Sequence, residues 1–324
     1  MLIYAGIDEA GYGPIFGPLV VARTLFAIEA ANPEQTLPSL WRLLPTAVCR
    51  LPTDRRDRIA VNDSKRLYAP HLGLDHLERG VLAFLPAFEA GEVSLEQLLQ
   101  RLAPPASASW LEHPCYAAGP LPVVPVMVDG GRLAKAQGRL QRAADRGGVR
   151  LLDAKAAVVL EDRFNQLLGE CGNKALVAWS LVADHLEALW RDYGHLQPQV
   201  VIDRQGGRIY YRELLARCFP RAMLELLHES PPLSRYRLVE GKRSLLVSVQ
   251  VRSEQAHLPT ALASMLAKYL RELLMLRFQA FWRRQAPQVR PTCGYAGDGR
   301  RFLREVEPFF APLGLDRERF VRCR

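Results

Sequence analysis

Apolar residues in this chain fall into short runs typical of buried strands and into longer segments with helical spacing. A run of about four to eight aliphatic residues predicts a buried strand, whereas apolar positions three or four residues apart predict a helix. Strand patterns occur at 2–7, 19–21, 25–28, 149–152, 199–203 and 238–251, and helical patterns occur at 174–189 and about 258–284. The first two strands flank a glycine-rich turn, and residues 238–251 are typical of a hairpin.

Two adjacent carboxylates, Asp8 and Glu9, stand where the first apolar run gives way to glycine. Because a buried strand cannot tolerate two unpaired charges at its end, they are expected either to pair with cations or to bind metal. Gly11 and Gly13 allow the backbone to turn sharply and to approach a bulky ligand. A solvated turn is the alternative interpretation, since an isolated Asp-Glu pair is usually exposed.

Several further polar positions have ordinary structural interpretations as well as functional ones. Asp63 or Ser64 could cap a helix by accepting hydrogen bonds from its first amides. Lys65, at the start of that helix, is also well placed to meet a phosphate. Glu254 precedes the long helix, where the helix dipole favours an acid. Tyr295 lies in a glycine turn, where a tyrosine commonly has a structural role.

The stretch 5–21 resembles the signature of the type 2 ribonucleases H, the family of ribonuclease HII and ribonuclease HIII. In that family a strand ending in Gly-Ile-Asp-Glu-Ala-Gly is followed by Arg-Gly-Pro and Gly-Pro-Val-Val, and here Tyr12 takes the arginine position. Residues 61–67 resemble the family's Asp-Ser-Lys-Lys-Leu element. Residues 262–268 resemble its Ala-Ser-Ile-Leu-Ala-Lys helix, and Gly294-Tyr295 resembles its Gly-Tyr pair.

The resemblance implies a ribonuclease H-like α/β fold, in which a mixed β-sheet is flanked by helices on both faces. Residues 92–148 are rich in Ala, Pro, Gly and Arg, with Pro104-Pro105 and Gly119-Pro120, and are expected to form an insertion or small lobe. The ribonuclease H-like domain would then comprise 1–91 and 149–324, the latter including C-terminal helices.

The resemblance also implies four catalytic carboxylates that bind metal: Asp8, Glu9, Asp203 and Glu254. The family has an aspartate where Glu254 stands. Asp129, in Val-Asp-Gly-Gly, is an alternative to Asp203, which we prefer because the elements around it follow the family's order. Oxygen-only ligands suit Mg²⁺ or Mn²⁺, and two such ions would support phosphodiester hydrolysis to 5′-phosphate and 3′-hydroxyl products.

Residues that would contact nucleic acid follow from the same resemblance: Gly11, Tyr12, Gly13, Ser64, Lys65, Lys268 and Tyr295. In the family, backbone groups of the glycine turn read the ribose 2′-hydroxyl, which distinguishes RNA from DNA. The family tyrosine stacks on the sugar at the cleavage junction. The implied substrate is an RNA–DNA hybrid or duplex DNA that contains ribonucleotides.

Composition agrees with a polyanionic partner but does not identify one. The 324-residue chain carries a formal charge of +9, and its six cysteines are dispersed, which argues against a zinc site or a disulfide framework. Without a membrane-length apolar run or a signal-peptide pattern, we expect a cytoplasmic protein. The departures at Tyr12 and Glu254 leave two alternatives: a non-catalytic nucleic-acid-binding homologue, or a nuclease of the same fold that acts on another DNA structure.

Overall fold

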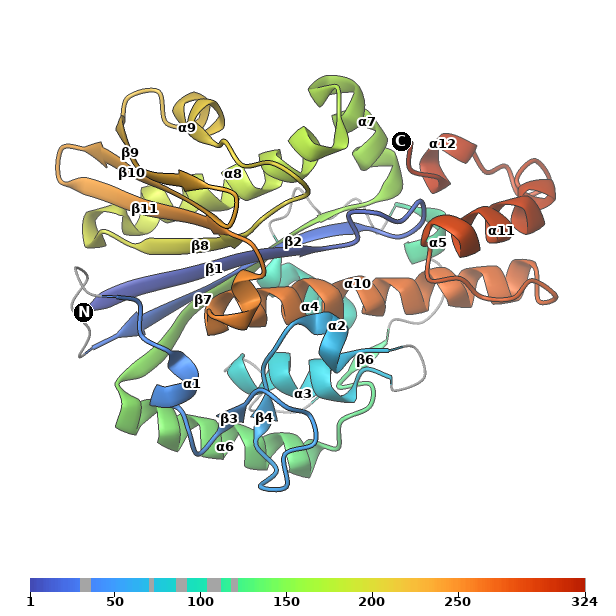
Figure 1. The fold of residues 1–324 in the computed structure, drawn as a ribbon. Coiled ribbons are helices and arrows are strands. Elements are labelled where there is room, and N and C mark those ends of the chain that lie inside the picture. The colour runs from blue at the N-terminus through green and yellow to red at the C-terminus, as the bar shows by residue number, and fades with distance from the viewer. Residues whose placement is uncertain (30–35, 70–72, 86–91, 104–111, 118–121, 324) are drawn as a thin grey trace.

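A seven-stranded mixed β-sheet forms the centre of the protein in a computed structural model that describes residues 1–29, 36–69, 73–85, 92–103, 112–117 and 122–323 (Figure 1). The strand order is β7-β2-β1-β8-β11-β10-β9. The strands span β1 Leu2–Ala10, β2 Leu19–Ile28, β7 Val149–Val159, β8 Gln199–Asp203, β9 Met223–Ser230, β10 Leu233–Glu240 and β11 Arg243–Gln250. β8 runs parallel to both β1 and β11, and the other neighbouring pairs are antiparallel.

Helices cover both faces of this sheet. α8 (Lys174–Tyr193) and α9 (Arg212–Cys218) lie on one face, and α10 (Leu258–Gln285), α3 (Asp75–Phe84) and α6 (Gly130–Gly147) lie on the other (Figure 1). The remaining α-helices are α1 Leu40–Leu43, α2 Ser64–Leu67, α4 Leu95–Leu102, α5 Pro114–Ala117, α7 Glu161–Cys171, α11 Ala296–Val306 and α12 Arg317–Phe320. Short 3₁₀ helices span Gly194–Leu196, Ser253–Gln255 and Glu307–Phe309, and the short strands are β3 Val48–Cys49, β4 Ile59–Ala60, β5 Val93–Ser94 and β6 Val123–Val124.

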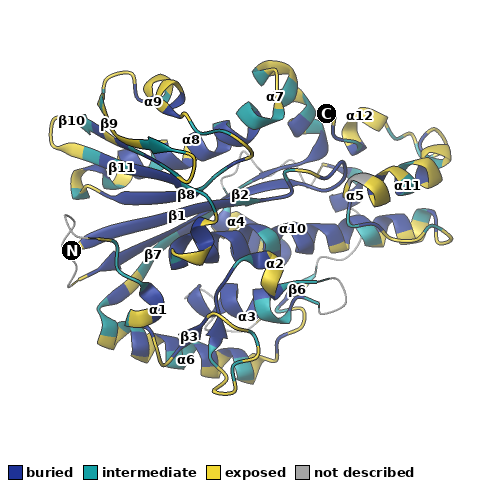
Figure 2. Ribbon diagram, in the orientation of Figure 1, coloured by how far each residue is buried: buried dark blue, intermediate teal, exposed yellow. Residues whose placement is uncertain are grey.

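Each central strand contributes to two hydrophobic cores, one on each side of the sheet. Along β1, Leu2 and Tyr4 pack into the core that contains α10, whereas Ile3, Ala5 and Ile7 pack into the core that contains α8. This division follows from the two-residue period of a strand. Burial on both faces explains why the strand reads as a continuous apolar run, and Figure 2 shows the central strands and α10 as the most buried elements.

A glycine brings the start of α10 directly against β1. A Cβ at Gly6 would lie 2.1 Å from the Thr260 nitrogen and 2.2 Å from the Pro259 carbonyl carbon, so only glycine fits there. The Thr24 hydroxyl also donates to the Pro259 carbonyl at 2.8 Å. Since Gly6 is two residues before Asp8, this close contact sets the polar end of β1 beside the first turns of α10.

The predicted fold class, an α/β fold with a mixed sheet flanked by helices, is confirmed. Residues 25–28, predicted as a separate strand, instead continue β2. The described residues of 92–148 include α4 and α6, whose apolar side chains join the same core as α10. The predicted boundary at residue 91, Pro104-Pro105 and Gly119-Pro120 lie outside the described residues.

Within the described part of the chain, no helix has the length and apolar character needed to cross a membrane.

Candidate active site

Strand register places two of the predicted carboxylates side by side. β1 and β8 are parallel with Ile7 opposite Ile202, so the next residues, Asp8 and Asp203, are neighbours at the carboxyl ends of both strands. Val201 faces the α10 core, and the alternation of side chains puts Asp203 on that same face. Asp8 is buried, with 8% of its surface exposed.

The fourth predicted carboxylate arrives from the other side of β8. β11 runs parallel to β8 with Gln250 opposite Asp203, and the chain then turns into the 3₁₀ helix that contains Glu254. Asp203 accepts hydrogen bonds from the Ser253 amide at 2.8 Å and from the Ser253 hydroxyl at 3.1 Å. Glu254 is buried, with 6% of its surface exposed. Asp8, Glu9, Asp203 and Glu254, which we name the carboxylate cluster, therefore come from three separate segments.

Neutral donors orient the members that lie at the strand ends. The Glu9 amide donates to the Asp8 carboxylate at 2.7 Å. The Gln205 side-chain amide donates to the Glu9 carboxylate at 3.4 Å. Gln205 lies two residues after Asp203, so the segment that follows β8 supplies a contact to the cluster.

The electrostatics of the carboxylate cluster favour a bound cation. Burial, followed by the charges of Glu9 and Asp203, raises the pKa of Asp8 well above its usual range. Burial and the charge of Asp203 raise the pKa of Glu9 to about 7. The same two causes raise the pKa of Glu254 to about 7. Crowded carboxylates in a buried site repel one another, and a cation would relieve that repulsion.

The predicted Asp-Ser-Lys element lies beside the cluster. Asp63 caps α2 by accepting from the Lys65 amide at 2.9 Å. Ser64 is buried, and its hydroxyl oxygen lies 3.1 Å from the Ser264 hydroxyl oxygen of α10, within hydrogen-bond distance. A hydrogen bond from Ser264 also lowers the pKa of Asp8 against the dominant effect of burial. Ser64 thus contacts Ser264, the residue that hydrogen-bonds to Asp8. Lys65 is exposed, and its charge acts to lower the pKa of Glu9.

Two buried arginines hold the glycine turn between β1 and β2. Gly11 has a left-handed φ of 86°, and a Cβ there would lie 2.2 Å from the Pro18 carbonyl oxygen. Arg322, near the C-terminus, donates to the carbonyls of Gly11 and Tyr12. Arg271 donates to the Phe16 carbonyl at 3.3 Å. The space around Gly13 is open, since a Cβ there would meet no atom within 4 Å.

The last two predicted nucleic-acid contacts lie near Glu272 of α10. The Lys268 ammonium pairs with Glu272 at 2.6 Å, so Lys268 has an intramolecular partner. Tyr295 is 46% exposed, and its ring lies 5.4 Å from the guanidinium carbon of Arg271. Tyr295 therefore remains accessible to a ligand, whereas Lys268 is bound to its own helix.

Asp129, the alternative to Asp203, lies elsewhere. It is exposed and caps α6 by accepting from the Arg132 amide at 2.9 Å. Among the residues that the structure describes, no three Asp, Glu, His or Cys side chains are arranged as a finished metal site. The oxygen donors of the carboxylate cluster are of the type that suits a hard divalent ion.

Several residues around the cluster carry no signal in the sequence. The sequence around Ser253 and Arg322 would fit many surface positions, and Ser264 belongs to the motif at 262–268 without a role assigned from the sequence. Their roles depend on contacts between distant segments, such as the Arg322 contact with Gly11. The position of Ser253, immediately before the predicted ligand Glu254, does place it near the cluster.

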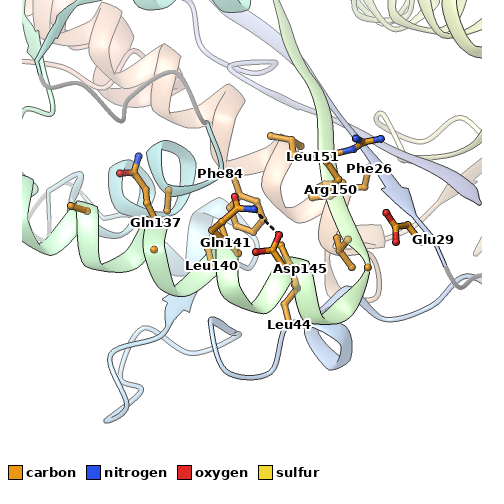
Figure 3. Close-up of a pocket in the computed structure, with 16 residues that line it drawn as sticks. Phe26, Glu29, Leu44, Phe84, Gln137, Leu140, Gln141, Asp145, Arg150 and Leu151 are labelled. Atoms are coloured by element: carbon orange, nitrogen blue, oxygen red, sulfur yellow. Dashed lines mark hydrogen bonds between the residues drawn. The ribbon is translucent and has the colours of Figure 1, made fainter.

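One cavity does not coincide with the carboxylate cluster. It has a volume of about 830 Å³ and lies between α6, the start of β7 and the end of β2 (Figure 3). Its lining includes Phe26, Phe84 and Leu140, with Glu29 and Arg150 at the strand ends. Gln141 donates to Asp145 across one turn of α6 at 2.8 Å.

No protein-family model and no curated protein matches this sequence. Among solved structures, the chain is similar to ribonuclease HII of Archaeoglobus fulgidus in its complex with PCNA, at 16% identity and a TM-score of 0.42, over 100% of this chain and 95% of that one. It is similar to ribonuclease H2 of Pyrococcus horikoshii OT3 at 14% identity and a TM-score of 0.43, over 98% and 92%.

A third similar structure is Bst-RNase HIII in complex with Mn²⁺, at 12% identity and a TM-score of 0.41, over 99% of this chain and 66% of that one. At these identities the residues and their geometry must carry any conclusion about chemistry.

Proposed function

We propose that this protein is a divalent-metal-dependent endoribonuclease that cleaves the RNA strand of RNA–DNA hybrids. The observation that carries the proposal is the carboxylate cluster, in which Asp8, Asp203 and Glu254 meet at the ends of parallel strands. Their pKa values rise because they are buried together, and such perturbed groups are typical of functional sites. Hydrolysis by water at such a site requires no covalent nucleophile from the protein.

The carboxylates would hold Mg²⁺ or Mn²⁺, because four oxygen donors with mutual repulsion suit a hard cation. When bound, two such ions would activate water and stabilise the leaving oxygen, which gives 5′-phosphate and 3′-hydroxyl products. The serines would keep the ligands in place: Ser253 by its two hydrogen bonds to Asp203, and Ser264 by its bond toward Asp8.

Recognition of ribose would fall to the glycine turn. Arg322 and Arg271 fix its carbonyl groups from the buried side, and the open space at Gly13 leaves that part of the backbone accessible. Exposed Tyr295 offers a ring for stacking, and exposed Lys65 offers a charge for a phosphate. A hybrid or a duplex with an embedded ribonucleotide is the substrate class that these groups fit, and we place the reaction in the cytoplasm.

A cleavage assay tests the proposal. The substrates are an end-labelled RNA–DNA hybrid, a DNA duplex with one ribonucleotide and an all-DNA duplex, each in Mg²⁺ and in Mn²⁺. We expect cutting only at ribonucleotides, with rates reduced about 1000-fold or more in Asp8→Asn and Asp203→Asn, equivalent to ~4 kcal/mol of lost transition-state stabilisation. Asp129→Asn is the matched control, because asparagine can also cap α6 and the site is remote from the cluster.

Two outcomes would replace the proposal with an alternative. Tight binding of hybrid without cutting in either metal would indicate a non-catalytic nucleic-acid-binding protein. Tyr12 and Glu254 motivate that alternative, because both depart from the family pattern. Cutting of the all-DNA duplex would indicate a nuclease of the same fold with another substrate.

A further inference from the structure

A pocket lined by arginines lies next to the carboxylate cluster and is not used by the proposed reaction. It has a volume of about 780 Å³, and its lining includes four arginines and one acid, Asp54. The arginines are Arg50, Arg55, Arg58 and Arg66. We name this feature the arginine pocket. Its net charge is positive even when Asp54 is counted against one arginine, which favours an anionic ligand.

The arginine pocket borders the carboxylate cluster through two neighbouring residues. Its lining includes Gln255, which follows Glu254, and Asn62, which precedes the Asp63 cap of α2. Arg50 joins these sides, because its guanidinium donates to the Gln255 carbonyl while its own carbonyl accepts from the Asn62 amide at 2.9 Å. A strand leaving the cluster on this side would therefore meet the pocket next.

Two of the arginines are fixed in place. The Arg50 guanidinium stacks over the Trp41 ring, 3.7 Å from its centroid. Arg58 pairs with Asp54 at 2.6 Å. By contrast, the exposed side chains of Arg55 and Arg66 have no ion pair or hydrogen bond to any described residue. The pocket thus combines two arginines held in position with two others that form no ion pair with a described residue.

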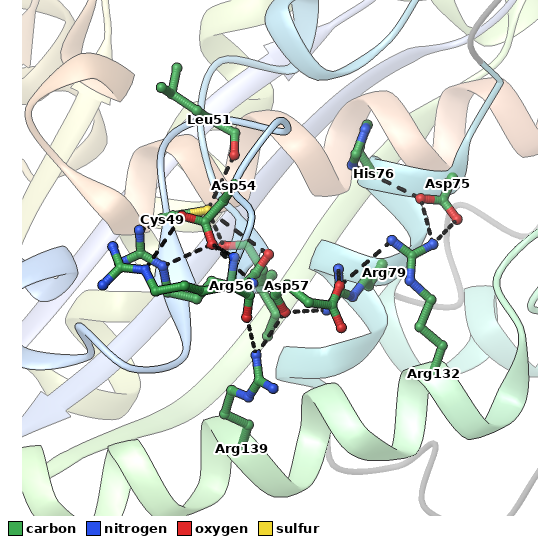
Figure 4. A network of polar contacts seen from close by, with 12 residues as sticks. Cys49, Leu51, Asp54, Arg56, Asp57, Asp75, His76, Arg79, Arg132 and Arg139 are labelled. Carbon is green, nitrogen blue, oxygen red and sulfur yellow. Dashed lines mark hydrogen bonds and ion pairs between the residues drawn. The ribbon is translucent and has the colours of Figure 1, made fainter.

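The loop that carries Arg55 is anchored to two helices (Figure 4). Arg79 of α3 pairs with the Asp57 carboxylate at 2.8 Å and donates to the Asp57 carbonyl at 2.7 Å. Arg139 of α6 donates to the carbonyls of Arg56 and Asp57 at 2.8 and 2.9 Å. These contacts hold the loop in one position, so the pocket is a built feature of the fold.

We propose that the arginine pocket binds backbone phosphates of the nucleic acid on one side of the cleaved bond, through Arg55 and Arg66. This inference rests on the proposed function for the identity of the bound strand. Guanidinium groups match phosphate oxygens in two-point hydrogen bonds, and contacts of this kind position a strand without reading its sequence. The fixed Arg50 and Arg58 would add charge at no cost in side-chain ordering.

The test compares Arg55→Ala/Arg66→Ala with Arg212→Ala/Arg217→Ala, a control pair of exposed arginines on α9. Binding of the full chain to a labelled RNA–DNA hybrid is measured in EDTA, so that no strand is cut, over a series of salt concentrations. We expect the first pair to weaken binding ~10-fold and to reduce the slope of log affinity against log salt by about 2, one for each lost contact. The control pair is expected to change neither. Arg55→Lys/Arg66→Lys should restore most of the slope, since it keeps the charge.

Substrate length provides the second measurement. Hybrids are lengthened stepwise on each side of the cleaved bond, and KM and kcat are measured in Mg²⁺. The alanine pair should raise KM without changing kcat, and only for hybrids that extend far enough on one side. Equal salt slopes for the alanine pair and the control pair would overturn the proposal, even if cleavage is normal. Binding of inorganic phosphate is measured as well. If the alanine pair loses phosphate binding but binds the hybrid normally, the proposal is also overturned, because the pocket would then be a site for free anions. If no hybrid is cleaved, the proposed function is contradicted, and the salt slopes measured in EDTA still test phosphate binding by the arginine pocket.

Discussion

Glu272 of α10 and the carboxylate cluster beside the first turns of α10 are both buried, but they differ in what surrounds them. Glu272 meets the Lys268 ammonium at 2.6 Å, the Arg271 guanidinium at 2.9 Å and the Tyr68 hydroxyl at 2.7 Å. Asp8, two turns earlier beside Ser264, receives hydrogen bonds from a hydroxyl and a backbone amide. The first carboxylate has two cations as partners, and the second has neutral donors.

The pKa values of the two groups show the consequence. Burial acts to raise the pKa of Glu272, but Lys268 and Arg271 outweigh it and hold that pKa below its usual value. In the carboxylate cluster, burial and neighbouring negative charges act in the same direction, so the pKa values of Glu9 and Glu254 rise to about 7. The fold provides counterions where a carboxylate is structural. Among the described residues, no Lys or Arg forms an ion pair with the carboxylate cluster, and only the charge of exposed Lys65 acts to lower the pKa of Glu9, as expected for a cation-binding site.

Removing the paired carboxylate should have the largest effect on stability. We expect Glu272→Gln to lower the free energy of unfolding by about 3–5 kcal/mol, because it leaves fully buried Arg271 without its counterion. Chemical denaturation at pH 7 measures the change. Glu213→Gln, on the exposed side of α9, is the matched control and should stay within about 0.5 kcal/mol of the native chain.

The pH dependence of this difference follows from the lowered pKa of Glu272. A depressed pKa in the folded state contributes stability at pH values above the unfolded value of 4.5, and this contribution is lost as the pH falls through the folded value. The gap between the native chain and Glu272→Gln should therefore narrow below about pH 4.5. A gap that is constant across this range would mean that the charge of Glu272 is not what stabilises the fold.

Divalent metal should stabilise the protein by binding to the carboxylate cluster. At a free Mg²⁺ or Mn²⁺ concentration 100 times the dissociation constant, binding to the folded state alone adds ~2.7 kcal/mol to the free energy of unfolding. Thermal unfolding with metal, and with KCl at matched ionic strength, measures the gain. Asp8→Asn and Asp203→Asn should lose it, and Asp129→Asn should keep it. An equal gain in all four proteins would place the metal outside the carboxylate cluster.

The sequence predicted the elements that carry the cluster because their patterns are local. The apolar run before Asp8, the strand before Asp203 and the helix after Glu254 all have the predicted type. The adjacency of Asp8 and Asp203 follows from the parallel register of β1 and β8, which the family resemblance implied and residue spacing alone could not give.

What the sequence could not predict depends on contacts between distant segments. Arg322 reaches the glycine turn from the far end of the chain, and Ser64 of α2 meets Ser264 of α10. The arginine pocket brings the stretch from Trp41 to Arg66 against Gln255, which is distant in the sequence. Lys268 matched a nucleic-acid contact by resemblance, whereas the structure pairs it with Glu272 one turn later on α10.

The smallest expected effect is the sharpest test of the difference between Glu272 and the carboxylate cluster, because its sign is opposite to that of Glu272→Gln. In EDTA, Asp8→Asn should raise the free energy of unfolding by about 1 kcal/mol, since asparagine removes a buried charge that repels Glu9 and Asp203. Its side-chain oxygen can still accept from the Glu9 amide, so the hydrogen bond is retained. The same variant should be less stable than the native chain once saturating Mg²⁺ is added, because only the native chain binds it. A loss of stability in EDTA would mean that Asp8 already has a favourable partner in the metal-free protein, and the two groups of carboxylates would then not differ in kind.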